Sequence, residues 1–126
     1  MKTMVAAAWA LSFAAMFPGA VFAAGGALNT SGKRVVDAAG MTVYTFDKDK
    51  ANSGKSMCNG PCAKSWPPVM APAGTQPSGD LGVVMREDGG KQLSYRGKPL
   101  YHYAKDQAKG DMKGDKFKGM WHVVTP

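Results

Sequence analysis

Two histidines, His102 and His122, are the side chains in this sequence best suited to binding a metal. Imidazole and thioether ligands suit copper, and Met120 lies close before His122. The histidines are not at ligand spacing, however, and the other methionines after residue 23 are scattered at Met41, Met57, Met70, Met85 and Met112. A single histidine between aromatic residues of a strand is more often a packing residue. Copper binding or electron transfer by His102, His122 and Met120 is therefore the alternative hypothesis, and it requires the two histidines to meet.

No motif of a known catalytic site occurs in the sequence. It has no G-x-S-x-G elbow, no H-E-x-x-H helix, no phosphate-binding loop and no dinucleotide-binding glycine pattern. Its carboxylates lie mostly in expected turns beside lysines, a setting that suits solvation more than acid catalysis. Asp49 is expected to bind backbone N–H groups where the chain leaves a strand. We therefore expect a protein that is not an enzyme.

Residues 1–23 have the features of a secretory signal peptide. Lys2 supplies a positive charge, residues 5–17 are almost wholly apolar, and the small residue Ala23 ends the segment. We expect cleavage between Ala23 and Ala24, a periplasmic or secreted location, and a single domain over residues 24–126. The apolar run is too short for a transmembrane helix, and no later stretch is long enough.

The two cysteines, Cys58 and Cys62, lie in the expected mature chain. In an exported protein an isolated pair favours a disulfide, and Asn59-Gly60-Pro61 between them is typical of a turn. A redox pair and a pair of thiolate metal ligands are the rival interpretations. The spacing is not that of a thioredoxin-like pair, and no second cysteine pair completes a zinc site. We predict a structural disulfide that contributes about 2 kcal/mol, because the loop it closes is small.

The sequence is basic, with a formal net charge of +7. Its lysines gather in one segment, at Lys105, Lys109, Lys113, Lys116 and Lys118. This composition favours an anionic partner in the cell envelope, although a solvated lysine-rich loop is the simpler interpretation. Export and the absence of a nucleic-acid-binding motif disfavour nucleic acid.

One segment of the sequence occurs twice, at residues 40–49 and 97–106. Both copies begin with Gly, place aromatic residues at their centre and end in Lys-Asp. The shared residues are Tyr44, Phe46 and Asp49 in the first copy, and Tyr101, Tyr103 and Asp106 in the second. A tryptophan follows each copy, at Trp66 and Trp121. Such duplication determines the architecture, because one copy alone cannot bury its apolar face.

The repeat divides the domain into related halves, residues 33–70 and 81–126. We expect strands over 33–37, 41–46, 81–86, 91–95, 98–103 and 121–125, a helical turn from Pro61, and a mobile lead over 24–32. The first two strands should form a hairpin, and Pro99 should lie on a sheet edge or at the start of a strand. These elements predict an all-β fold, a small sandwich or distorted barrel with a pseudo-two-fold axis. The aromatic residues of both copies, with Trp66 and Trp121, should border its core.

The repeated motif resembles that of a bacterial family of secreted repeats and predicted lipoproteins, which is Tyr-x-(Phe/Trp/Tyr)-x-x-Asp. The resemblance extends to the segments 58–68, 95–101 and 119–122, and to Asp88-Gly89 with Gln92. It implies an envelope location and two repeats, and it carries over no catalytic residue. A lipid-anchoring cysteine is missing after the leader, so an anchor is not implied. The leading hypothesis is a non-enzymatic binding or envelope-associated module of unknown ligand.

Overall fold

A computed structural model of the chain describes residues 27–126. The predicted signal peptide and its cleavage site lie outside the described residues. The elements are, in chain order, β1 (Leu28–Ser31), β2 (Arg34–Asp37), β3 (Tyr44–Phe46), α1 (Pro61–Ser65), β4 (Leu81–Met85), β5 (Lys91–Tyr95), β6 (Lys98–Pro99), a 3₁₀ turn η1 (Phe117–Gly119) and β7 (Trp121–Val123).

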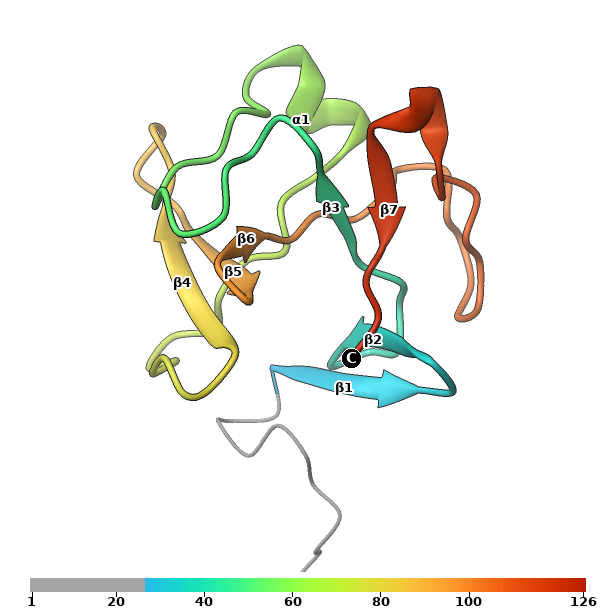
Figure 1. Cartoon of the computed structure of the whole chain (residues 1–126), viewed down its shortest axis with the longest axis horizontal. Coiled ribbons are helices and arrows are strands. Elements are labelled where there is room, and N and C mark those ends of the chain that lie inside the picture. Colours follow the sequence, from blue (N-terminus) through green and yellow to red (C-terminus); the bar gives the residue numbers. More distant parts are fainter. Residues whose placement is uncertain (1–26) are drawn as a thin grey trace, which may run out of the picture.

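The strands form three small antiparallel sheets, with the orders β1-β2, β3-β7 and β4-β5-β6. Figure 1 shows the β3-β7 pair at the middle of the molecule, with β4-β5-β6 to one side, β1-β2 at one end and α1 at the other. The two repeats fit two related halves, and the prediction of an all-β fold is confirmed. The strands do not close into a barrel.

The expected mobile lead over residues 24–32 is wrong for the described part of that segment. Leu28 begins β1 and is fully buried, while the rest of the strand is polar and exposed. β1 pairs with β2 along its whole length, from Leu28 with Asp37 to Ser31 with Arg34. A single apolar residue gave no alternating pattern to recognise, and the strand forms because Leu28 enters the core.

The expected hairpin between the first two strands forms only at its turn. Val36 and Thr42 make an antiparallel bridge, and the Asp37 backbone N–H donates to the Met41 carbonyl at 2.9 Å, but the longer pairing of β2 is with β1. β3 pairs instead with β7, from the far end of the chain, with Phe46 opposite Trp121. Asp37 makes the intervening turn by accepting the backbone N–H of Met41 at 2.9 Å.

The second half follows the expected elements more closely. β4 and β5 form the predicted hairpin, with Met85 opposite Lys91, and β6 lies at the edge of that sheet with Pro99. The predicted helical turn is α1, which begins at Pro61 and ends before Trp66. Proline suits the first turn of a helix, because no N–H is required there.

The core consists of two clusters, which neighbouring residues of the first repeated segment join. Val43 packs in an aliphatic cluster with side chains from both halves, among them Leu28, Leu93 and Leu100. Tyr44 and Phe46 lie in an aromatic cluster. That cluster contains every aromatic residue predicted to border the core, and the prediction is confirmed: Tyr44, Phe46, Trp66, Tyr101, Tyr103 and Trp121.

Candidate functional site

The centre of the molecule is the junction of the two repeated strands. Tyr44 and Tyr101 form an antiparallel bridge, in which each backbone N–H donates to the other residue's carbonyl, at 2.8 and 2.9 Å. The side chains then cross between the repeats. The Tyr44 hydroxyl donates to Asp106 at 2.5 Å, and the Tyr101 hydroxyl donates to Asp49 at 2.6 Å. Each repeat therefore supplies the carboxylate that binds the other repeat's tyrosine.

Both aspartates also hold the loop that follows their strand. The other carboxylate oxygen of Asp49 accepts the backbone N–H of Met57, and that of Asp106 accepts the N–H of Lys113. This confirms the expectation that Asp49 binds backbone where the chain leaves its strand. The crossed tyrosine bond was not predicted. The signal for it was the shared spacing of tyrosine and aspartate in the two copies.

Burial and these carboxylates change the acid–base properties of the groups. Burial, followed by the hydrogen-bonded aspartate, raises the pKa of both Tyr44 and Tyr101, so each hydroxyl stays a donor. Burial also raises the pKa of Asp49, although its bonds to Tyr101 and Met57 oppose the change. The crossed pairs therefore act as fixed structural bonds.

Beside these pairs, four aromatic rings form one continuous stack in the order Tyr103, Trp66, Trp121, Phe46. The ring centroids are 4.1, 3.8 and 4.2 Å apart along the stack. The two indoles are almost parallel, at 2°. The two inner rings occupy equivalent positions in the two repeats, and so do the two outer rings. The stack therefore joins the two repeats, as the crossed pairs do.

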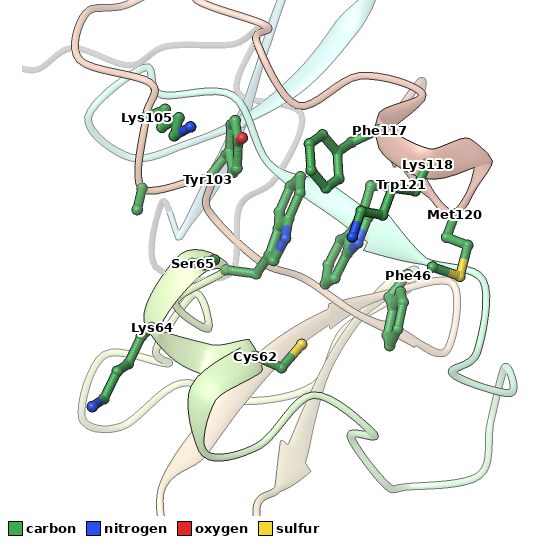
Figure 2. Close-up of a pocket in the computed structure, with 12 residues that line it drawn as sticks. Phe46, Cys62, Lys64, Ser65, Tyr103, Lys105, Phe117, Lys118, Met120 and Trp121 are labelled. Atoms are coloured by element: carbon green, nitrogen blue, oxygen red, sulfur yellow. The ribbon is translucent and has the colours of Figure 1, made fainter.

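The stack borders a groove of about 470 Å³, the candidate ligand site. Its other lining residues come from α1, from the lysine-rich loop and from η1: Cys62, Lys64, Ser65, Ala104, Lys105, Phe117, Lys118 and Met120. Figure 2 shows the rings side by side, with Phe117 beside them and Lys118 reaching over the stack from η1. The lining contains three lysines and no carboxylate.

The η1 segment holds Phe117 and Lys118 at the edge of this groove. Lys116 and Lys118 both have left-handed backbone, with φ of 65° and 50°, which side-chain-bearing residues rarely adopt. The Phe117 ring lies 5.7 Å from Trp66 and 5.8 Å from Tyr103, and the Lys118 ammonium lies 5.6 Å from the Phe117 ring. Phe117 keeps about a third of its surface exposed (36%). It is the accessible aromatic face of the groove.

The predicted disulfide joins Cys58 to Cys62 and places one of its sulfurs at the groove. Cys58 is fully buried, and its carbonyl accepts a hydrogen bond of 3.0 Å from the Arg86 guanidinium. Arg86 also donates to Ser56 and Gln92, at 3.1 and 2.9 Å. This buried arginine fixes the loop that the disulfide closes, called the cysteine loop below, to the second repeat. Nothing in the sequence indicates this role, because an arginine just after a strand is ordinarily exposed.

In the described chain the two candidate copper-binding histidines are each bonded to a different aspartate. His102 bonds to Asp37 at 2.7 Å, and His122 bonds to Asp47 at 2.9 Å. Met120 packs against the aromatic cluster and lines the groove. Within residues 27–126 no group of three or more histidine, cysteine, aspartate or glutamate side chains could hold a metal. Copper binding stays a prediction without support from these residues.

The clustered lysines are all exposed, as a solvated loop requires: Lys105, Lys109, Lys113, Lys116 and Lys118. Two of them also line the groove, so the loop and the candidate site are continuous. Among residues 27–126 no helix is long and apolar enough to cross a membrane.

Comparison with known proteins gives a family and nothing closer. The sequence model of a family described as a secreted repeat of unknown function matches twice, over residues 27–70 and 82–125. The two matches cover most of the chain and correspond to the two related halves. No curated protein and no protein of solved structure shows a significant match.

Proposed function

The chain belongs to this family of secreted repeats, and from that membership we propose that it is a non-enzymatic, envelope-associated binding module whose ligand site is the groove beside the ring stack. The observation that carries the proposal is the groove itself. Its volume, about 470 Å³, lies within the range of pockets that bind small molecules. Its floor is held rigid by stacking between two repeats, and a rigid site loses little conformational entropy on binding.

The composition of the lining supports binding over catalysis. No histidine, aspartate or glutamate lines the groove. The groups that could transfer a proton near neutral pH are therefore elsewhere, with each histidine bonded to its own aspartate. The lysines that border the groove attract anions, and the lining has no histidine or carboxylate beside them to act as a base.

The test uses the exported protein and an envelope preparation separated into aqueous and organic-solvent fractions. A ligand that binds only the native state raises the unfolding temperature, so one fraction should raise it in a concentration-dependent way. Phe117→Ala removes the accessible ring of the groove and should abolish most of that rise. Met57→Ala is the matched control, because Met57 is more exposed (61%) and is not among the lining residues.

Two outcomes contradict the proposal. One is that no fraction raises the unfolding temperature, or that both variants respond like the parent protein. The other is conversion of a component of the active fraction into a new product, followed by mass spectrometry, since that would make the protein an enzyme.

A further inference from the structure

The ring stack presents a particular part of each indole to the groove. Trp66 is stacked between Tyr103 and Trp121, and Trp121 between Trp66 and Phe46. Both faces of both indoles are therefore covered by other rings. Since both indoles nonetheless line the groove, they contribute their edges to it. The floor of the groove is thus a row of aromatic edges.

Aromatic edges carry partial positive charge, because the ring quadrupole is negative on the face and positive at the rim. Each indole also has one N–H donor on its rim. Trp66 and Trp121 are 4% and 3% exposed, and within residues 27–126 neither indole N–H donates to another protein group. Buried donors normally have a partner, so these two are available to an acceptor brought by a ligand.

The charged side chains around the floor have the same sign. Lys64, Lys105 and Lys118 line the groove without a carboxylate among the lining residues. Asp106, which follows the lining residue Lys105 in the chain, is already engaged, because it binds the Tyr44 hydroxyl and the Lys113 N–H. Edges, N–H donors and ammonium groups therefore all favour a ligand that is rich in electrons.

Resting on the function proposed above, we propose that the groove binds a planar aromatic anion, such as an aryl carboxylate. The negative face of the ligand ring lies across the row of positive edges, in the edge-to-face arrangement that aromatic pairs prefer. Its carboxylate accepts the indole N–H groups and pairs with Lys118. Phe117 forms the adjoining wall of the site.

The experiment compares four probes by ¹⁵N-resolved NMR and calorimetry on the exported protein. They are naphthoate, naphthalenemethanol and naphthylmethylamine, which share a ring and differ in charge, and decanoate, which shares the carboxylate but has no ring. Naphthoate should bind about tenfold more tightly than the alcohol, because its carboxylate makes charge-assisted hydrogen bonds that the alcohol cannot make. It should also shift the indole N–H resonances of Trp66 and Trp121 downfield, which binding elsewhere on the surface would leave in place.

Lys118→Met keeps an unbranched apolar stem of nearly the same length and removes the charge. It should weaken naphthoate binding about tenfold and leave binding of the alcohol unchanged, since only the anion pairs with the ammonium. Lys91→Met is the control, because Lys91 is exposed and is not among the lining residues. Equal losses in the two variants would attribute the effect to net charge and overturn the assignment of the site.

The remaining outcomes each decide the inference. Equal affinity for naphthoate, the alcohol and the amine overturns the requirement for an anion, and equal affinity for decanoate overturns the requirement for an aromatic ring. Failure of all four probes overturns the ligand class. The envelope-fraction experiment then shows separately whether the groove binds something else, so the two proposals can fail independently.

Discussion

The two crossed tyrosine–aspartate pairs have the same geometry, yet they lie in different surroundings. At the cysteine end, formed by Tyr101 and Asp49, the tyrosine hydroxyl also contacts Ser56 at 2.6 Å, and Ser56 accepts from Arg86. At the lysine end, formed by Tyr44 and Asp106, the additional donor within residues 27–126 is the backbone N–H of Gly114, at 3.2 Å.

This difference separates what builds the fold from what distinguishes the halves. Tyrosine, aspartate and the ring stack are common to both ends and fix the junction of the repeats. The cysteine end adds a disulfide and a buried arginine, which make its loop rigid. The lysine end has neither, and its loop instead supplies Lys105, Phe117 and Lys118 to the groove. The candidate site is therefore asymmetric although its floor is symmetric.

Removing the buried arginine should have the largest effect on stability. Arg86→Met leaves Ser56, Gln92 and the Cys58 carbonyl without their donor and should lower the free energy of unfolding by about 3–5 kcal/mol. Urea denaturation measures this change. Arg96→Met is the control, since Arg96 is exposed, and it should change stability by less than about 0.5 kcal/mol. Equal effects would show that burial gives Arg86 no special role.

Removing one hydroxyl from each end compares the two pairs directly. Tyr101→Phe should cost about 2–3 kcal/mol, and Tyr44→Phe about 1.5–2 kcal/mol, because loss of a hydrogen bond to a charged group leaves a buried carboxylate under-satisfied. The first should cost more, since it also removes the contact between the tyrosine hydroxyl and Ser56, which has no counterpart side chain in the Tyr44 pair within the described chain. Double-mutant cycles with Asp49→Asn and Asp106→Asn measure the coupling in each pair. A larger coupling energy for the pair at the lysine end than for the pair at the cysteine end would contradict the expected order.

Breaking the disulfide tests how much of the cysteine end depends on covalent linkage. The variant Cys58→Ala with Cys62→Ala should lose about 2 kcal/mol, because the closed loop is short. Reducing agent should produce the same loss in the parent protein and none in the variant, measured by thermal unfolding. A loss far above this range would mean that the disulfide, and not Arg86, holds the loop.

The smallest expected effect concerns pH. Burial raises the pKa of Asp49 in the folded state, so the native protein binds this proton more tightly than the unfolded chain does. The contribution of Asp49 to stability is therefore most favourable at a pH below the pKa that Asp49 has in the unfolded chain. It declines as the pH rises through the pKa that Asp49 has in the folded protein. The free energy of unfolding of the parent protein minus that of Asp49→Asn should be greater near pH 4, about the ordinary pKa of an aspartate, than near pH 7. A difference that grows with pH would contradict this sign.

Features set by short-range chemistry followed from the sequence. The β4–β5 hairpin has two alternating strands around a glycine-rich turn, and α1 begins at a proline and stops before a proline pair. The disulfide required only the spacing of its cysteines and export. The β1 strand could not be predicted in this way, because a single buried leucine produces no pattern.

The long-range pairings needed the folded chain. Nothing local indicates that β3 pairs with β7 across most of the sequence, or that Arg86 turns inward to the cysteine loop. The groove also could not be predicted from local sequence. Phe117 and Lys118 lie in a segment that reads as a solvated lysine loop, and they acquire a role only because the ring stack lies beside them.

The sequence by itself determined that the protein is a duplicated all-β unit with an aromatic core and a disulfide. These follow from the repeat, from alternation and from residue spacing, which are properties of the chain at short range. The tertiary structure decided that each aspartate binds the tyrosine of the other repeat, and that the four rings stack into one row. Those arrangements depend on how the two copies pack against each other, and a linear repeat does not specify whether its motifs close on themselves or on their partners.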